Sequence, residues 1–449
     1  MTAGAALYGD LYGTTEMRAV FSLRSRLRAM LDVEVALARA EAQTGIIPSA
    51  AADAIARAAD VDRLDVDAIV SATQRVGYPV VPLTKQLAQL AGAPAGGYVH
   101  WGATTQDILD TAAVLQLEHA FALLEADLAA TIDALAGLAS HHRDDTMPGR
   151  THMQQALPIT FGYKCALWVA PLIDHRARLS NARAEVKQLQ FGGAVGTLAS
   201  LGSRGREVAL ALGAELGLRV PDAPWHVDRS AFAAAACTLG LVCGSLAKFA
   251  TDVVLLMQTE IGEAAEPHAP GRGGSSTMPQ KRNPIASEYI LATARGVHAL
   301  VPVMLQAMAG DHERSSGPWQ SEELALAQIF VLASATFAQS LAVARGITVD
   351  RQRMQRNLEL TNGLIVSESV SMALAEKVGH GRAHAIVEAA AAEATDANVA
   401  LRDVLLQNSE VASLFDRAAL DELLDPAKYL GDAGAVVDRV VGRAFTTTG

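Results

Sequence analysis

Five long stretches with helical spacing of apolar residues constrain the fold more than any other feature of this sequence. In the first of them, Leu117, Phe121, Leu124 and Leu128 recur at intervals of three and four residues, which indicates one apolar face of a helix. Helices of this length lie well above the globular average, and several stretches are apolar around most of their circumference. A monomer leaves such faces in water, so we expect subunits to associate. The five stretches span about residues 110–140, 159–189, 228–264, 285–309 and 321–347.

The sequence predicts an all-α fold of three domains. The chain has 449 residues, 50% of them hydrophobic but only 5% aromatic, so small side chains fill the core and let helices pack closely. We predict a helical N-terminal domain over residues 1–109, a central bundle of long helices over residues 110–350, and a C-terminal domain of smaller helices over residues 351–449. No stretch shows a convincing β-pattern or an internal repeat.

Within the N-terminal domain, glycine and proline residues indicate where the expected helices end. Residues 19–44 run without Gly or Pro at near-helical spacing and predict a helix that stops at Gly45 and Pro48. Further on, Pro79 and Pro82 are expected to break any helix.

The net charge of −11 argues against a nucleic-acid partner, because phosphate binding requires a basic surface. It leaves a small anionic substrate open, since such a ligand responds to the local field of its pocket. Residues 1–13 lack a basic n-region and carry Asp10, so they do not resemble a secretory signal. We therefore expect a cytoplasmic protein with reduced thiols at Cys165, Cys237 and Cys243.

One uncharged run, Ser230 to Ala247, is long enough to invite a membrane assignment. Its bulk is Ala, Gly, Ser, Thr and Cys, and Lys248 and Asp252 follow on the same predicted helix. We interpret it as a buried helix of a soluble oligomer, without membrane contact. The sequence also contains no zinc-spaced ligand cluster, dinucleotide fingerprint or phosphate loop, so we expect no metal ion and no organic cofactor.

The stretch Gly273–Pro284, GGSSTMPQKRNP, interrupts the helical pattern between two of the long stretches. Glycines allow the backbone to approach a ligand, and prolines keep the segment out of the flanking helices, which predicts a loop that closes as a lid. Lys281 and Arg282 can neutralise carboxylates, and the N–H groups of a glycine-rich turn can form an anion nest. A solvated basic loop is the simpler alternative for such a composition.

Two further polar stretches come directly before long helical ones. In HWGATTQDILDT, Thr104 and Thr105 can cap a helix and offer hydroxyl and N–H donors to an anion. In GRTHMQQALP, His152 can transfer protons near neutral pH, and Gln154 can orient a carboxylate or carbonyl. Taken singly, the first stretch is also explained as a plain N-cap and the second as a structural histidine.

The string GSSTMPQKRNP resembles the signature of the fumarase/aspartase superfamily, which includes adenylosuccinate lyase, argininosuccinate lyase and 3-carboxy-cis,cis-muconate cycloisomerase. The two other polar stretches resemble the remaining homologous regions of that superfamily, in the same order. The resemblance covers nearly the whole chain and implies an all-α fold with a small N-terminal domain, a central five-helix domain and a small C-terminal domain. It also implies a homotetramer that pools its central helices, with each active site drawn from three subunits.

The same resemblance implies a small dicarboxylate or tricarboxylate substrate and a mechanism. A base removes the proton next to a carboxylate, an enolate-like intermediate forms, and the group on the β-carbon leaves. Ser275 is carried over as the base, with Ser276 as its competitor, while Lys281 stabilises the new charge and His152 is the expected acid. The expected substrate-binding residues are Thr104, Thr105, Thr151, Gln154, Ser276, Met278, Asn283 and Arg314.

Particular strings narrow the resemblance within the superfamily. Members that hold a nucleotide phosphate pair an early Arg with a later Arg and Ser in the segment DHERSSGPWQSEE, whereas here Arg314 is followed by Glu323, whose charge opposes a phosphate. This disfavours a nucleotide substrate. GATTQDILDTA, GGAVGTLASLG and LDPAKYLG resemble bacterial 3-carboxy-cis,cis-muconate cycloisomerases, enzymes of the beta-ketoadipate pathway of aromatic catabolism.

That branch commonly carries Trp where this chain has His152, and His where it has Gln280. A carboxylate leaving group is stable as an anion, whereas an amine needs a proton, so an imidazole at position 152 also favours a lyase that releases fumarate from an amino- or nitro-succinate. His141 and His142 are alternative acids for a cycloisomerase. We therefore expect the muconate-lactonising reaction first, the carbon–nitrogen lyase second, and a non-catalytic structural homologue, as lens crystallins are, third.

Overall fold

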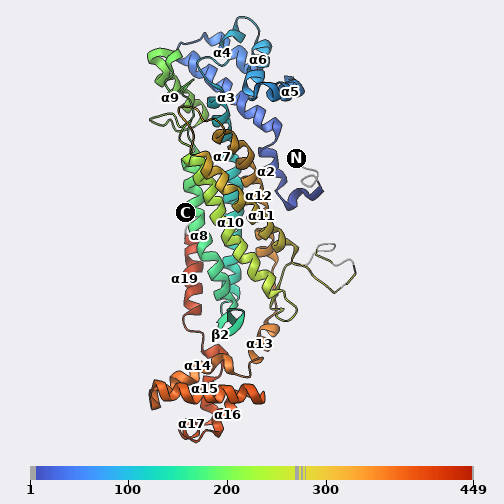
Figure 1. Cartoon of the computed structure of the whole chain (residues 1–449), viewed down its shortest axis with the longest axis vertical. Helices are drawn as coiled ribbons and strands as arrows, with labels where there is room; N and C mark the ends of the chain where they lie inside the picture. Colours follow the sequence, from blue (N-terminus) through green and yellow to red (C-terminus); the bar gives the residue numbers. More distant parts are fainter. Residues whose placement is uncertain (1–6, 268–272, 275–276, 279, 447–449) are drawn as a thin grey trace. The chain divides into compact units, whose positions relative to one another are not determined.

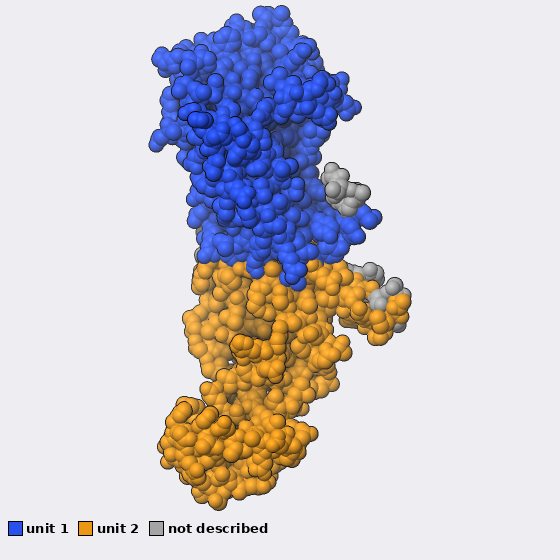
Figure 2. Space-filling model, in the orientation of Figure 1, with its two compact units in different colours: residues 1–127, 175–244, 289–338 blue, residues 128–174, 245–288, 339–449 orange. Residues whose placement is uncertain are grey.

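The computed structural model of this chain describes residues 7–267, 273–274, 277–278 and 280–446, which are mostly helical. The all-α prediction is therefore confirmed. The division into three domains at residues 109 and 350 stays a prediction. By internal contacts the chain divides into two compact units: unit 1 comprises residues 1–127, 175–244 and 289–338, and unit 2 comprises residues 128–174, 245–288 and 339–449 (Figure 2).

Five long helices correspond to the five predicted stretches (Figure 1). The boundaries of the two units fall inside these helices. Their ends lie within a few residues of the predicted ones, except that the third helix ends at Leu256 and does not continue toward residue 264. The helices are α7 (Thr105–His141), α8 (Phe161–Val186), α10 (Ser230–Leu256), α11 (Ile285–Ala307) and α12 (Pro318–Gly346).

Within unit 1, α7 packs against α12 and α8 through side chains of different kinds. The Phe121 ring of α7 meets Phe330 of α12 edge to face, with ring centroids 5.1 Å apart. Arg183 of α8 donates to Glu125 of α7 at 2.7 Å. Both phenylalanines are fully buried, whereas the ion pair is partly exposed. The aromatic contact therefore belongs to the core, and the ion pair lies at its edge.

In the same unit, α11 packs against α10 and α12 through small and hydroxylated residues. The Nε2 atom of His298 lies 2.9 Å from the carbonyl oxygen of Gly240, and a Cβ added at Gly240 would lie 3.3 Å from Val301. The hydroxyl groups of Thr293 and Thr336 share a hydrogen bond of 2.8 Å. These close approaches agree with the small-residue core that the composition predicts.

Shorter helices of unit 1 enclose a separate apolar core that includes Leu27, Ile55, Leu83 and Leu87. The core is built mainly from helices near the N-terminus, together with the beginnings of α7 and α12. The shorter helices of this core are α3 (Leu23–Gln43), α4 (Ser49–Ala58), α5 (Val66–Val76), α6 (Val80–Ala91) and α9 (Gly205–Leu216), whereas α2 (Thr15–Val20) contributes no residue to it.

One sequence-based expectation about this region is confirmed except at its start, and another is wrong. The helix predicted over residues 19–44 is divided, because the Ser22 side chain accepts the N–H of Ser25 and starts a new helix. Pro79 and Pro82 do not break a helix, since Pro79 is the N-cap of α6 and Pro82 lies in its first turn. The N–H groups of a first turn have no intrahelical partner, so proline loses nothing there.

Short β-pairings correct the expectation of no β-structure. In β1–β2 the two strands run antiparallel, with Met147 opposite Ile159 and Thr151 opposite Gln154. The strands are short and each carries a proline, so their sequence shows no clear alternation. The strands are β1 (Thr146–Thr151), β2 (Gln154–Thr160), β3 (Ala264–Ala265) and β4 (Thr348–Val349), and β3 pairs with β4.

Helices after α12 form an apolar core of their own in unit 2, around Leu374, Ile386, Leu401 and Leu405. This core is built from α14 (Ser367–Val378), α15 (His380–Ala397), α16 (Leu401–Gln407), α17 (Ser409–Leu414) and α18 (Arg417–Leu423), whereas α13 (Arg351–Glu359) and α19 (Ala433–Thr446) contribute no residue to it. Short 3-10 helices span Gly9–Leu11, Val61–Arg63, Ala95–Tyr98, Ala199–Arg204, Leu364–Val366 and Pro426–Lys428.

Three of the described helices, α10, α11 and α12, have the length and composition needed to cross a membrane. In α10, 50% of the most apolar 18-residue stretch is buried within the chain, and in α11 the share is 33%. Exposed apolar side chains on these helices include Leu241, Leu305 and Leu324. Association of subunits would cover such faces, and this expectation stays a prediction.

Candidate active site

The predicted site residues divide between the two units. Unit 1 holds Thr104, Thr105 and Arg314. Ser275 and Ser276, the two candidate bases, lie outside the described residues. Unit 2 holds the remaining predicted residues, which are Thr151, His152, Gln154, Met278, Lys281 and Asn283.

Thr104 and Thr105 form the entry to α7. Thr105 is the first residue of the helix, and the Asp107 carboxylate accepts the backbone N–H of Thr104 at 3.0 Å. In return the Asp107 N–H donates to the Thr104 carbonyl oxygen at 3.0 Å. This is the acidic half of a capping box, and it places Thr104 at the positive end of the helix dipole.

Asp107 also fixes a glycine-rich loop to this helix entry. Its carboxylate accepts the side-chain amide of Gln190 at 3.0 Å and the N–H groups of Gly192 and Gly193 at 2.9 Å each. Burial raises the pKa of Asp107 to about 6, and these hydrogen bonds oppose the shift. Residues 192–196, with the sequence GGAVG, form this loop. One buried carboxylate therefore holds the first residues of the GGAVG loop beside Thr104.

Arg314 holds the same loop from its carbonyl side. Its guanidinium donates to the carbonyl oxygen of Ala194 at 2.8 Å, to that of Gly193 at 3.3 Å, and to the side-chain oxygen of Gln106 at 2.6 Å. These three partners are neutral, so they orient the guanidinium without cancelling its charge. Arg314 was predicted from the sequence to bind substrate, and the structure gives it contacts that position the loop.

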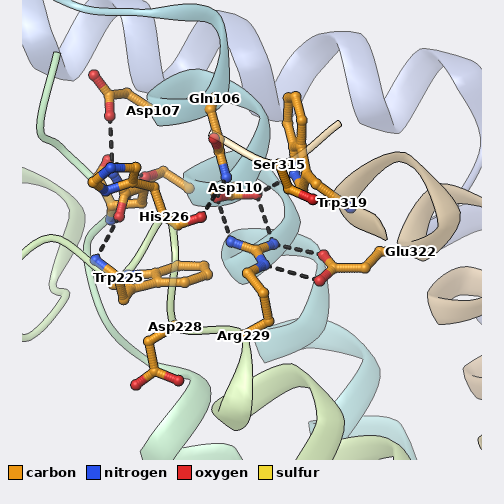
Figure 3. Close-up of polar contacts among 12 residues, drawn as sticks. Gln106, Asp107, Asp110, Trp225, His226, Asp228, Arg229, Ser315, Trp319 and Glu322 are labelled. Atoms are coloured by element: carbon orange, nitrogen blue, oxygen red, sulfur yellow. Dashed lines mark hydrogen bonds and ion pairs between the residues drawn. The ribbon is translucent and has the colours of Figure 1, made fainter. Parts of the chain in front are cut away.

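A buried ion cluster lies behind Gln106 (Figure 3). Arg229 donates to both oxygens of Asp110, at 2.7 and 3.0 Å, and to both oxygens of Glu322, at 2.8 and 2.6 Å. Burial lowers the pKa of Arg229, but the two carboxylates outweigh it and the net shift is upward. The Trp225 ring, 4.9 Å from the guanidinium carbon, adds a cation–π contact. Gln106 connects this cluster to Arg314, because its amide nitrogen donates to Asp110 at 3.1 Å.

His226 lies beside the same network (Figure 3). Its carbonyl oxygen accepts the Gln106 amide at 3.0 Å. The imidazole is buried, and neither ring nitrogen has a hydrogen-bond partner among the described residues. Burial first, and then the charge of Arg314, lowers the pKa of His226. Burial therefore favours the neutral form of the ring, which packs against Gly196 of the GGAVG loop.

The second predicted segment is the tip of the β1–β2 hairpin. His152 and Met153 form a two-residue turn between Thr151 and Gln154, with φ angles of 51° and 64°. Left-handed backbone is unfavourable for residues other than glycine and is concentrated at functional sites. The side chain of His152 is exposed at this tip. The hairpin therefore displays the imidazole, which disfavours the interpretation of His152 as a buried structural histidine.

The end of the hairpin next to the turn is fixed by a buried carboxylate, because Arg150 lies opposite Gln155 in the pair before the last. Arg150 donates to both oxygens of Glu263, at 2.8 and 2.6 Å, and the Asn357 side chain donates to the same carboxylate at 2.7 Å. Gln155 donates in turn to the Asn357 carbonyl oxygen at 2.9 Å. The bidentate geometry restrains the hairpin on which His152 is carried.

The third predicted segment is Gly273–Pro284, and its two described ends pair with each other. The N–H of Asn283 donates to the Gly273 carbonyl oxygen at 2.9 Å, and Gly274 forms an antiparallel bridge with Arg282. Gly273 has a φ of 69°, and a Cβ there would lie 2.7 Å from the Asn283 carbonyl oxygen, so this position requires glycine. Lys281 is exposed, and its N–H donates to the Met278 carbonyl oxygen at 3.1 Å.

The helix after this segment begins on a fixed carboxylate. Glu266 accepts the N–H of Ala286 at 3.0 Å, and from Ser287 it accepts both the N–H and the hydroxyl at 2.6 Å. Glu266 therefore caps α11 from a position 20 residues earlier in the chain. This contact anchors the end of the segment that contains Lys281 and Asn283.

His141 and His142, the alternative acids, lie at the end of α7. The Nδ1 atom of His142 is 2.5 Å from Asp145, and Arg351 donates to the same Asp145 oxygen at 2.6 Å. Burial lowers the pKa of His142, with Asp145 opposing the shift. His142 is thus engaged in a hydrogen-bond network with Asp145, whereas the His141 side chain is exposed.

Within the described ranges, no group of three or more His, Cys, Asp or Glu side chains has the geometry to hold a metal ion. Cys165 and Cys243 are fully buried, and burial raises the pKa of the Cys243 thiol to about 12. Neither thiol has the properties of a nucleophile.

Sequence reasoning missed the residues that hold the candidate segments in place. Asp107, Arg229, Glu263 and Glu266 are all buried and charged, and all act on partners far away in the chain. The available signal was a charged residue in or beside an apolar stretch, as with Arg229 directly before the uncharged run of α10. Such residues are rarely buried without a partner, and they indicate an ion cluster.

Comparisons with known proteins identify the family to which this chain belongs. The family described as "Lyase" matches residues 12–298, and the one described as "Adenylosuccinate lyase C-terminus" matches residues 363–440. The 3-carboxy-cis,cis-muconate cycloisomerase of Pseudomonas aeruginosa is 45% identical over 97% of this chain and 95% of its own length. The trans-aconitate decarboxylase 1 of Mycosarcoma maydis is 41% identical over 99% and 90%. The crystal structure of the 3-carboxy-cis,cis-muconate lactonizing enzyme of Pseudomonas putida superposes with a TM-score of 0.94 at 43% identity, covering 99% of this chain and 100% of that one.

Proposed function

Because this chain belongs to the lyase family of the fumarase/aspartase superfamily, we propose that it is a 3-carboxy-cis,cis-muconate cycloisomerase. The observation that carries the proposal is the full-length similarity to cycloisomerases in both sequence and fold. The substrate is then a small tricarboxylate, and the reaction belongs to aromatic catabolism.

The reaction is an isomerisation in which no atom is lost. A carboxylate oxygen of the substrate adds to the carbon β to a second carboxyl group, and the electrons of the double bond move into that group. The resulting enolate-like intermediate carries two negative charges until a proton is added at the α-carbon. Lys281 and Asn283 are proposed to stabilise this charge, and Ser275 to exchange the α-proton. No organic cofactor or metal ion is required by this sequence of steps.

Thr104, Thr105, Thr151, Gln154, Ser276 and Met278 are proposed to bind the substrate carboxylates. Hydroxyl and amide donors suit that role, and the entry of α7 supplies the positive end of a helix dipole. Arg314 is proposed to contribute its charge while holding the GGAVG loop through Gly193 and Ala194.

We further propose a cytoplasmic homotetramer that pools its long helices and builds each active site from three subunits. The exposed apolar side chains of α10, α11 and α12 support an association of this kind. Size-exclusion chromatography with light scattering tests it. A soluble tetramer is expected, and a monomer, or recovery only in the membrane fraction, would contradict the proposal.

A carbon–nitrogen lyase that releases fumarate from a substituted succinate is the second candidate. The exposed imidazole of His152 on its strained turn favours it, because an amine leaving group needs a proton. A non-catalytic homologue is a third candidate, and the presence of Ser275, Lys281 and Asn283 in the signature argues against it.

The experiment that separates these candidates is an ultraviolet assay of the purified protein. Loss of the conjugated absorbance of 3-carboxy-cis,cis-muconate supports the cycloisomerase. Fumarate formation from a panel of N-substituted succinates, without muconate turnover, supports the lyase. Absence of turnover on both substrate sets supports the non-catalytic homologue.

A further inference from the structure

A pocket of about 430 Å³ in unit 2 is lined by the β1–β2 hairpin, the beginning of α8 and the end of α10. Its polar lining consists of Arg150, Thr151, Tyr163, Lys164, Lys248 and Asp252. The volume lies in the range of pockets that hold small molecules. Arg150 and Thr151 also belong to the hairpin that displays His152, so the pocket adjoins a predicted part of the active site.

The carboxylates nearest to Lys164 already have partners. Asp252 accepts the indole N–H of Trp168 at 2.7 Å and forms an ion pair with Lys248. Glu263 is held by Arg150 and by the Asn357 side chain. Among the described residues, no hydrogen bond or ion pair engages the Lys164 ammonium. The pocket therefore contains a cation that lacks a partner.

The charges around this cation leave the pocket positive. Arg150, Lys164 and Lys248 line it, against the single lining carboxylate of Asp252. Burial lowers the pKa of Lys164, the charge of Asp252 opposes this, and Lys248 and Arg150 add to the lowering. A partly buried ammonium without a partner is unfavourable, and an anionic ligand relieves that cost.

We propose that this pocket is a carboxylate subsite, in which the Lys164 ammonium pairs with a substrate carboxylate other than the one beside the reacting carbon. The Tyr163 and Thr151 hydroxyl groups supply further donors at its wall. A tricarboxylate substrate has such an additional carboxylate, whereas a dicarboxylate such as fumarate lacks a third one. The identity of the ligand rests on the proposed function, but the presence of an anion subsite at Lys164 does not.

The test uses propane-1,2,3-tricarboxylate, which is saturated and cannot lactonise, as the probe. Its affinity is measured by titration calorimetry on the full-length protein and on Lys164→Gln, Lys164→Arg and Lys377→Gln. Lys377 is exposed on α14 and serves as the matched control. We expect Lys164→Gln to weaken binding by about tenfold or more, Lys164→Arg to retain part of the affinity, and Lys377→Gln to match the unchanged protein. Equal affinity in Lys164→Gln, or no binding to the unchanged protein, overturns the inference.

A second measurement covers the case in which Lys164→Gln does not fold. The unchanged protein is acetylated with and without the probe, and modification is quantified by peptide mass spectrometry. Protection of Lys164 but not of Lys377 supports the subsite, and an unprotected or unreactive Lys164 overturns it. Muconate turnover with unprotected Lys164 removes the inference and leaves the proposed function. Protection of Lys164 without muconate turnover removes the proposed function and leaves the inference of an anion subsite.

Discussion

Arg314 and Gln106 are joined by a hydrogen bond of 2.6 Å from the guanidinium to the amide oxygen. The nitrogen of the same amide donates to Asp110, so one glutamine connects the loop of Arg314 with the buried Arg229 cluster. The GGAVG loop is thereby held between two rigid attachments, Asp107 on its N–H side and Arg314 on its carbonyl side.

Replacing Arg314 by alanine should release the carbonyl side of this loop. We expect kcat/KM to fall by about tenfold or more, because three hydrogen-bond acceptors lose a charged donor. Arg314→Lys should restore little, since an ammonium cannot reproduce the fork geometry. Steady-state kinetics measures the effect, and Arg75→Ala, at an exposed position on α5, is the control. Wild-type kinetics in Arg314→Ala would refute the positioning role.

Replacing Arg229 by leucine should leave two buried carboxylates without their cation. Breaking a buried ion pair in this way typically costs about 3–5 kcal/mol. We expect a large drop in the thermal unfolding midpoint or loss of soluble protein. Arg183→Leu, which removes a partly exposed ion pair with Glu125, should cost much less. Similar midpoints for the two variants would contradict this account of the cluster.

Glu41 should make stability depend on pH. It is fully buried on α3, and neither carboxyl oxygen has a partner among the described residues. Burial, assisted by Glu34, raises the pKa of Glu41 from 4.5 to about 9. Between these values the folded protein holds a proton that the unfolded chain has lost, so stability falls as pH rises through this window.

Glu41→Gln should therefore gain stability over the unchanged protein as the pH increases from 6 to 8.5. The slope removed is up to about 1.4 kcal/mol per pH unit. Thermal unfolding across this range measures it, with Glu376→Gln at an exposed position of α14 as the control. A midpoint difference that stays constant with pH would show that Glu41 is not the protonated group.

Ser275→Ala should abolish turnover and leave the oligomer intact, because the group proposed to exchange the α-proton is lost without any change in the helices. Ser276→Ala removes a proposed substrate contact, so it should raise KM more than it lowers kcat. Progress curves and size-exclusion chromatography provide the two readouts. If Ser276→Ala is the inactive variant and Ser275→Ala is active, Ser276 is the residue that exchanges the α-proton.

The long helices could be predicted from the sequence because apolar periodicity is a local property. Their observed ends depend on contacts such as the Asp107 cap of α7, which the polar stretch before that helix indicated. The β1–β2 hairpin could not be predicted in this way. Its strands are short and carry prolines, and its turn end is fixed by Glu263, 113 residues away from Arg150.

The candidate site was found only as three separate segments. Their residue types indicated anion handling, but the residues that hold them were invisible, since Asp107 and Gly193 are 86 positions apart and Arg229 and Asp110 are 119 apart. A buried carboxylate gives no local signal of which distant N–H groups it will accept. The candidate catalytic and binding residues could thus be proposed from the sequence, whereas the residues that hold their segments in place required the structure.

The most direct test of the proposed function is incubation of the purified protein with 3-carboxy-cis,cis-muconate in D₂O, followed by NMR of the product. The account predicts a lactone with one deuterium on the carbon next to a carboxylate, and loss of the ultraviolet absorbance at the same rate. Unchanged muconate after prolonged incubation with folded, oligomeric protein would contradict it.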